Sequence, residues 1–258
     1  MLLALSTWPE VEQYLRGSRG VLVPVGSTEQ HGPTGLIGTD ALCAEAVAQR
    51  AGERAAALVG PTIALTGAQF NLAFPGSISL RASTLMALVE DYVRSLAGQG
   101  FERFYFVNGH GANGAALKAA FHDLHGLRSF GAPRTERALR FRVRSWWEYP
   151  EVDALRRVLY GAGEGLHATP SEIAITQALY PGLKARPALP PAAPLTAEAL
   201  KERTGDQHED ALSHRAEFPD GRVGSDSALA TPEDGAKLLE AAVAALVLDY
   251  QAFMKDDA

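Results

Sequence analysis

VLVPVGSTEQHGPTGLIGTD, residues 21–40, joins a short β-branched run to a polar, glycine-rich loop. The run VLVPVG (21–26) predicts a buried strand, because it is short, apolar and bounded by turn-forming residues. Three further runs of this kind follow, at PTIALT (61–66), RFYFVNG (103–109) and RALRFRVRSWW (137–147). Segments with apolar residues at helical spacing separate the four runs, at residues 39–57, 83–100 and 113–126. This alternation predicts a three-layer α/β/α fold with a mostly parallel central sheet.

The remainder of the chain fits the same domain. Residues 181–195, PGLKARPALPPAAPL, are too rich in proline for a helix interior or a central strand, so we predict a surface loop. Residues 231–254 open with Thr-Pro and acidic residues and continue with helical spacing, which predicts a long C-terminal helix. The chain has 258 residues, of which 47% are hydrophobic, and we therefore predict a single domain over residues 1–258.

Composition argues against several classes of partner. The formal net charge is -6, from 30 acidic and 24 basic residues, and no basic cluster is present that could neutralise a row of phosphates, so nucleic acid is not expected. No run of about 18 apolar residues predicts a membrane span, and the N-terminus lacks a secretory pattern, so we expect a cytoplasmic protein.

The one cysteine, Cys43, lies in a helical run and is predicted to be a small buried side chain.

The loop after the first predicted strand is dense in potential metal ligands. Glu29, His31 and Asp40 fall within twelve residues. Side chains at positions i and i+2 of an extended segment share a face, so Glu29 and His31 can point at one ion, and the glycines that follow allow Asp40 to fold back. An ordinary surface loop with scattered polar residues is the alternative.

Two later segments carry ligands of the same kind. FVNGHGANG places His110 just beyond a predicted strand, where ligands gather in open α/β sheets. Parallel strands end at one edge of a sheet, so His110 is expected near the first cluster. GEGLHATPSEIAITQAL carries His167 in a loop and Glu172 in the first turn of a predicted helix, although an acidic residue there is also an ordinary helix-start feature.

Taken together, these segments resemble the creatininase family. The resemblance rests on five motifs that follow the family's order and spacing over most of the chain: GSTEQHGP with GTD (26–40), FPGSISL (74–80), VNGHGAN (107–113), HATPSE (167–172) and GSDSALATPEDG (224–235). The resemblance implies a creatininase-like α/β/α domain and a metal-dependent hydrolase that cleaves amide-type C–N bonds other than peptide bonds.

The resemblance also implies a site with two divalent ions, zinc or manganese, with iron as a further option because imidazole and carboxylate ligands suit all three. On the matching positions, Glu29 and His110 would each bind one or the other metal, His31 would bind a single metal, Asp40 would bridge the pair and Glu172 would complete the set. Such ions lower the pKa of a shared water to about 7, and a nearby acid must protonate the departing nitrogen. His167 matches the family's proton donor; a loop histidine making one structural hydrogen bond is the alternative.

Departures from the family pattern bear on the substrate. Members that hydrolyse creatinine carry a glutamate where this chain has Ala112 and a tryptophan where it has Gly163. The expected substrate is therefore a small amide of cyclic or formamide type, rather than creatinine itself. A peptidase that trims a modified peptide, and a different dinuclear-metal hydrolase on the same scaffold, are the alternatives. Family members commonly form hexamers, so a homo-oligomer is expected.

The remaining histidines and a tryptophan pair lie outside this set. His122, His125, His208 and His214 fall in helical or polar stretches and are predicted to be solvated. Trp146 and Trp147 follow a predicted strand, where they could line a pocket; core or subunit contacts are the alternative.

Overall fold

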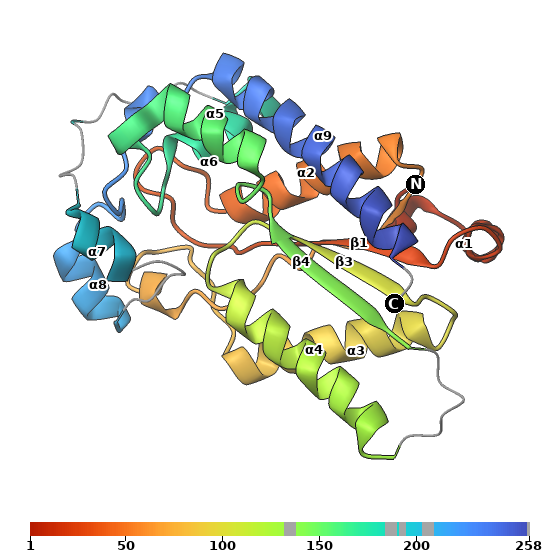
Figure 1. The fold of residues 1–258 in the computed structure, drawn as a ribbon. Helices are drawn as coiled ribbons and strands as arrows, with labels where there is room; N and C mark the ends of the chain where they lie inside the picture. The colour runs from red at the N-terminus through yellow and green to blue at the C-terminus, as the bar shows by residue number, and fades with distance from the viewer. Residues whose placement is uncertain (132–137, 184–189, 191–194, 203–208, 257–258) are drawn as a thin grey trace.

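The computed structural model describes residues 1–131, 138–183, 190, 195–202 and 209–256. A four-stranded parallel sheet lies at its centre, in the order β2-β1-β3-β4. Its strands are β1 (Gly20–Val25), β2 (Leu58–Val59), β3 (Arg103–Asn108) and β4 (Arg140–Ser145). The fold is the predicted α/β architecture with a parallel sheet between helices (Figure 1).

Register brings the carboxyl ends of three strands level with one another. Val25 at the end of β1 pairs with Asn108 at the end of β3, and Asn108 pairs with Ser145 at the end of β4. Every residue of β1 is buried, as expected for an inner strand covered on both faces. The segments that leave β1, β3 and β4 therefore start from one edge of the sheet.

The second predicted strand is placed wrongly. Leu58 and Val59 pair with β1, whereas residues 61–66 contribute only a single bridge, between Ile63 and Val25. Pro61 has no backbone N–H to donate and interrupts the ladder at that point. The chain nevertheless stays alongside β1, because the N–H of Ile63 donates to the carbonyl of Pro24 at 3.0 Å.

Helices cover both faces of the sheet (Figure 1). One face carries α2 (Thr39–Arg54), α5 (Pro150–Tyr160), α6 (Pro170–Leu179) and α9 (Pro232–Lys255), and the other carries α3 (Ala82–Ala97) and α4 (Asn113–Ser129). The first layer packs Val47 and Leu246 against Tyr105, and the second packs Val89 and Leu117 in a separate core. Because α9 packs on α2, α5 and α6, we propose that residues 1–258 form one domain.

Five predicted helices are present, namely α2, α3, α4, α6 and α9, with ends shifted by a few residues where bounds were predicted. Helices that the sequence analysis did not predict are α1 (Trp8–Leu15), α5, α7 (Ala197–Glu202) and α8 (Ala211–Glu217). Short 3-10 turns lie at η1 (Leu3–Leu5), η2 (Gln69–Asn71), η3 (Gly161–Gly163) and η4 (Ser227–Leu229). The predicted loop at 181–195 falls mostly outside the described residues.

Two smaller expectations concern burial and membranes. Cys43 is fully buried in the core between the sheet and α9, as predicted, and burial raises the pKa of its thiol. Every helix in the described ranges is too short or too polar to cross a lipid bilayer.

Candidate metal centre

The six predicted site residues come from four segments that meet beyond the carboxyl ends of β1 and β3. Glu29 and His31 lie in the loop that follows β1, Asp40 is the second residue of α2, and His110 follows β3. His167 lies in the turn that leads into α6, and Glu172 is the third residue of that helix. All six are buried, with exposed fractions of 0% for Glu29 and His31, 3% for Asp40 and His110, 5% for His167 and 9% for Glu172.

Two groups of three share the carboxylate of Asp40. In the first, His110 Nδ1 lies 3.1 Å from Glu29 Oε1 and 3.2 Å from Asp40 Oδ2. In the second, His31 Nε2 lies 2.8 Å from Asp40 Oδ1 and 3.9 Å from Glu172 Oε2. The potential ligand atoms of each trio all lie within 4.8 Å of one another. The two oxygens of Asp40 thus face one trio each, which is the arrangement that a bridging carboxylate requires.

Backbone carbonyls fix which ring nitrogen of His110 and of His31 faces the carboxylates. His110 Nε2 lies 2.9 Å from the carbonyl of Gly67, and His31 Nδ1 lies 3.1 Å from the carbonyl of Glu29. A carbonyl only accepts hydrogen bonds, so each of these nitrogens carries a proton. In the neutral rings, His110 Nδ1 and His31 Nε2 therefore present lone pairs to carboxylate oxygens. Such second hydrogen bonds are how proteins orient metal-binding histidines.

Buried oxygens of the first trio lack donors of their own. Apart from His110, Glu29 Oε1 and Asp40 Oδ2 have no hydrogen-bond donor among the described residues, although buried polar atoms are normally paired. Two carboxylate oxygens and a neutral imidazole nitrogen that converge in this way repel one another unless a proton or a metal cation lies between them. The donor set therefore fits a divalent ion bound through nitrogen and oxygen.

The charges around His31 and His110 also indicate a site that favours a cation. Burial disfavours the charged form of His31, yet the charges of Asp40 and Glu172 outweigh burial and raise its pKa to about 10. Burial also opposes the charged form of His110, but Glu29 and Asp40 hold its pKa well above the usual value. The site therefore attracts positive charge, which protons supply in the absence of metal. A divalent ion would have to displace these protons.

Glu172 serves as both a helix cap and a potential ligand. Its Oε1 accepts a hydrogen bond of 2.5 Å from the N–H of Thr169, in a capping box at the start of α6. Oε2 points toward His31. Burial raises the pKa of Glu172 to about 7. One oxygen of this carboxylate therefore caps the helix, and the other remains directed at the second trio.

Gln30, which sequence reasoning missed, fixes the orientation of His167. The two hydrogens of its Nε2 face the carbonyl of Gly221 at 2.9 Å and Asn71 Oδ1 at 2.8 Å, and its Oε1 accepts from the N–H of Gly32 at 2.7 Å. Since both hydrogens are used, Gln30 Nε2 cannot also donate to His167. His167 Nε2 therefore carries a proton and donates to the carbonyl of Gln30 at 2.8 Å.

The other ring nitrogen of His167 faces the two trios. Nδ1 lies 3.8 Å from Glu29 Oε1, and the ring centroid lies 4.6 Å from that of His31. Burial, followed by the charge of His31, lowers the pKa of His167 to about 3. The ring is neutral and its Nδ1 lone pair is directed at the site, so His167 must accept a proton before it can donate one.

Asn71 is a second residue that the sequence did not single out. Its Nδ2 donates to Glu29 Oε2 at 3.0 Å while its Oδ1 accepts from Gln30. Asn71 thereby leaves Glu29 Oε1 directed at His110. Metal-ligand spacing could not have indicated this residue, because a side-chain amide is not among the imidazole and carboxylate ligands considered, although η2 lies just before the FPGSISL motif.

A cavity of about 240 Å³ opens onto the trios. Asp40, His110, His167 and Glu172 line it, together with both tryptophans that follow β4. Trp146 is also buried in the core at 1% exposure, so the pocket and core interpretations both hold for it. Gly111, Gly165, Leu166 and Arg156 complete the walls near the mouth.

The prediction for His214 is wrong. Its side chain is buried at 2% exposure, with ring contacts to Phe70 and Phe218 at 5.2 Å each. The surrounding segment is polar in sequence, but α8 packs it onto η2, which periodicity over so short a helix could not reveal. His122 and His125 are exposed as predicted, and His208 lies outside the described residues.

Comparison with known proteins gives consistent matches. The family described as "Creatininase: Creatinine amidohydrolase" matches residues 4–248. Creatinine amidohydrolase of Pseudomonas putida is 32% identical over 198 residues, which cover 69% of this chain and 71% of that protein. A mycofactocin precursor peptide peptidase of Mycolicibacterium smegmatis is 43% identical over 106 residues, which cover 39% of this chain and 42% of the peptidase.

Solved structures match over the whole length. A structure described as "Creatininase Mn" has a TM-score of 0.75 and 27% identity, covering 99% of each chain. A mutant creatininase of "Zn-Zn type" has a TM-score of 0.73 and 27% identity, covering 99% of this chain and 98% of that one. A mutant creatininase complexed with creatine has a TM-score of 0.76 and 26% identity, covering 99% of each chain.

Proposed function

The chain belongs to the creatininase family of amidohydrolases, and from this premise we propose that it hydrolyses a small non-peptide amide with two divalent ions bound in the cavity. The observation that carries the proposal is the pair of buried trios that share Asp40. One ion would be held by Glu29, Asp40 and His110, and the other by His31, Asp40 and Glu172. Zinc and manganese are the first candidates, since relatives are described with each, and iron suits the same donors.

The chemistry requires a nucleophile and a proton for the leaving nitrogen. When bound, the two ions would lower the pKa of a water molecule to about 7 and polarise the amide carbonyl. His167 Nδ1 is positioned to accept the proton of the attacking water. The same nitrogen would then give that proton to the amine as the C–N bond breaks, since an amide anion is a poor leaving group. Gln30 would keep this nitrogen directed at the site.

Two residues outside the ligand set argue for a substrate other than creatinine. Ala112 and Gly163 take the places of the glutamate and tryptophan of the family's creatinine-hydrolysing members. A methyl group cannot transfer a proton, and a glycine cannot close over a ring. We therefore favour cyclic or formamide-type amides as substrates.

A peptidase is the second candidate function. The observation that favours it is the 43% identity to a mycofactocin precursor peptide peptidase, which is higher than the identity to creatinine amidohydrolase but covers less than half of either chain. Both candidates would use the same metals and His167, and they differ in the substrate that fills the cavity.

A metal and substrate assay tests the proposal. The purified chain would be reconstituted with zinc and, separately, with manganese, and bound metal would be measured by elemental analysis. We expect about two ions per chain and hydrolysis within a panel of cyclic ureas, formamides, lactams and short peptides. Fewer than one ion per chain would rule out the dinuclear site, and hydrolysis of peptides alone would favour the second candidate.

Replacing His167 with alanine is expected to spare metal binding and to slow turnover by about 10²- to 10⁴-fold, the usual contribution of a positioned acid–base group. Metal content by elemental analysis and kcat on the best substrate of the panel would be measured together. His122→Ala is the matched control, because His122 is exposed on α4. Parental turnover in the His167 variant would show that another group carries the proton.

We also propose that the chain forms a homo-oligomer, with a hexamer as the expected state. Leu5 and Trp8 are large apolar side chains near the N-terminus that are 81% and 77% exposed, and contact with another subunit would cover such groups. Light scattering on the purified protein tests this directly.

A further inference from the structure

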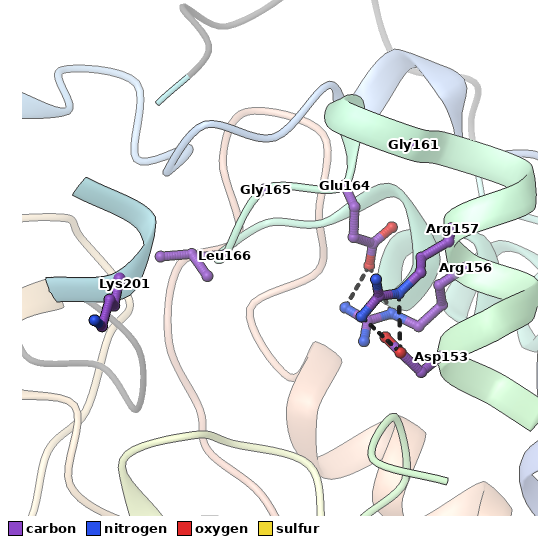
Figure 2. Close-up of a pocket in the computed structure, with 8 residues that line it drawn as sticks. All are labelled: Asp153, Arg156, Arg157, Gly161, Glu164, Gly165, Leu166 and Lys201. Atoms are coloured by element: carbon purple, nitrogen blue, oxygen red, sulfur yellow. Dashed lines mark hydrogen bonds and ion pairs between the residues drawn. The ribbon is translucent and has the colours of Figure 1, made fainter. Parts of the chain in front are cut away.

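A second cavity adjoins the one that holds the metal trios. Its volume is about 420 Å³, and Arg156, Gly165 and Leu166 line both cavities. The remaining walls are Asp153, Arg157, Gly161, Glu164 and Lys201. Figure 2 shows α5 with its charged side chains on one side of this cavity and Lys201 on the other, with Leu166 between them. The two cavities therefore meet at Arg156, Gly165 and Leu166.

Arg156 is held at the junction by a buried partner. Its Nε and Nη2 lie 2.9 and 2.7 Å from Glu164 Oε1, and the two side chains are only 15% and 12% exposed (Figure 2). Ser171, which lines the metal cavity, donates to the same oxygen of Glu164. This network ties the guanidinium to the start of α6, the helix that also carries Glu172. Arg156 is therefore pre-positioned relative to the metal site.

One edge of the guanidinium stays available. The pair with Glu164 uses Nε and Nη2, and Nη1 makes no hydrogen bond with any described residue. A guanidinium edge with two parallel N–H donors matches a carboxylate, which can accept both bonds at once. The remaining donors of Arg156 are thus suited to an anionic group with planar geometry.

Charge in the second cavity favours an anion as well. Arg157 is paired with Asp153 on the same helix at 2.9 Å, and Arg156 is paired with Glu164. Lys201 forms no ion pair within the described part of the chain. Three cations thus face two carboxylates, and one positive charge is left unbalanced in a chain whose overall charge is negative. An anionic substrate group would be attracted here in spite of the net charge of the protein.

We propose that the second cavity is a carboxylate subsite, in which the free edge of Arg156 binds a carboxylate on the part of the amide substrate that departs with the nitrogen. The inference rests on the proposed function, because it names the substrate class of the same site. Leu166, which lines both cavities, directly precedes His167, which lines the metal cavity. The proposal accordingly places the departing amine on the side of the second cavity.

The reaction then balances as a simple hydrolysis. Water oxygen forms a bond to the carbonyl carbon, the C–N bond breaks, and the water's proton ends on the departing nitrogen. The products are a carboxylic acid and an amine that carries its own carboxylate, as an amino acid or a peptide does. A small N-acyl amino acid and the C-terminal end of a peptide share this chemistry.

Substrate pairs that differ only in the charged group test the subsite. N-formyl and N-acetyl amino acids, and short peptides with a free C-terminus, would each be compared with the corresponding carboxamide on the metal-loaded enzyme. We expect the parent to prefer the carboxylate by about 10- to 100-fold in kcat/KM, since hydrogen bonds between charged groups contribute that much. Arg156→Gln should bring this ratio close to one, mainly through KM. Preference among the small acids would indicate a small-molecule substrate, and preference only among the peptides would indicate a peptide terminus.

Two further variants serve as controls for this test. Arg156→Gln leaves Glu164 buried without its partner, so Arg156→Gln with Glu164→Gln is made in parallel; two amides can keep a hydrogen bond without charge. Arg94→Gln is the matched control, because Arg94 pairs with a glutamate on a helix of the opposite layer, at 3.0 Å. Equal ratios in the parent for carboxylates and carboxamides, or an unchanged ratio in both Arg156 variants, would overturn the subsite.

Calorimetry distinguishes failure of the carboxylate subsite from failure of the proposed function. Binding of an N-acetyl amino acid is measured on the metal-loaded His167→Ala variant, in which turnover is expected to be slow, and the affinity should fall about 10- to 100-fold when Arg156 is also replaced. Binding that depends on Arg156 with no hydrolysis of any amide would support the subsite and remove the proposed function. Hydrolysis without any effect of Arg156 on affinity would keep the function and remove the subsite.

Discussion

Asn in place of Asp40 is expected to strip both metal ions and to abolish turnover. Asp40 is the one residue that belongs to both trios, with Oδ1 beside His31 and Oδ2 beside His110. An asparagine keeps the size of the side chain but removes the charge and offers one good ligand oxygen instead of two. Changes to groups that only support a metal ligand commonly cost about 10- to 100-fold in affinity or activity, so removing the shared ligand should exceed that range. Elemental analysis after dialysis, together with kcat/KM, measures both effects.

Glu172→Gln is the variant to compare with Asp40→Asn, because Glu172 belongs to one trio only. The glutamine can still accept the hydrogen bond from Thr169 and preserve the start of α6, while the negative charge is lost only from the second trio. We expect about one ion per chain to remain, in contrast to none for Asp40→Asn. Asp123→Asn on the exposed face of α4 is the control and should match the parent. Retention of two ions by Asp40→Asn would show that the two trios do not share this carboxylate.

Strand and helix periodicity in the sequence was sufficient to predict the central layers of the fold. The apolar runs at β1 and β3 are short, and nearly all of their residues are buried, so their pattern and their structure agree. The run at residues 61–66 misled the prediction because it looks like a strand, yet Pro61 prevents regular pairing and moves the ladder back to Leu58 and Val59. Helix α5 was missed, since charged residues on its exposed side mask a short apolar face.

The sequence predicted which candidate residues lie close together where strand ends dictate their position. His110 and the Glu29 segment follow neighbouring strands of a parallel sheet, so their meeting could be expected from topology alone. The roles of Gln30 and Asn71 could not, because they depend on the paths of two loops and on which amide atoms face which carbonyls. The position of Arg156 could not be predicted either, because only tertiary packing shows that a charged residue of α5 lines the metal cavity.

Gly109→Ala is expected to damage the metal site although it changes none of the ligands. Gly109 immediately precedes His110, and its N–H donates to the carbonyl of Val25 at 2.8 Å, at the level where β1 and β3 end. A Cβ at Gly109 would lie 2.2 Å from the carbonyl oxygen of Asp40. This oxygen belongs to the backbone at the start of α2 and cannot rotate away, so the strand end and the helix must separate.

That separation acts directly on the first trio, because Asp40 and His110 lie on the two segments that would be pushed apart. Forcing an extra methyl group into a packed region typically costs about 1–3 kcal/mol of stability. A displacement of about 1 Å at a reacting centre can cost about 100-fold in rate. We therefore expect a lower urea midpoint, weaker binding of the ion held by Glu29, Asp40 and His110, and turnover at least about 100-fold below the parent.

Gly114→Ala provides the matched control for this prediction. Gly114 lies four residues beyond His110 in the first turn of α4, and a Cβ there would meet no atom within 4 Å. Alanine favours helix over glycine, so this variant should be neutral or more stable by up to about 1 kcal/mol, with full metal content. The two variants add the same methyl group within one segment and differ only in what that group meets. Equal metal content and turnover in both would mean that the close approach of α2 to the end of β3 does not hold Asp40 against His110.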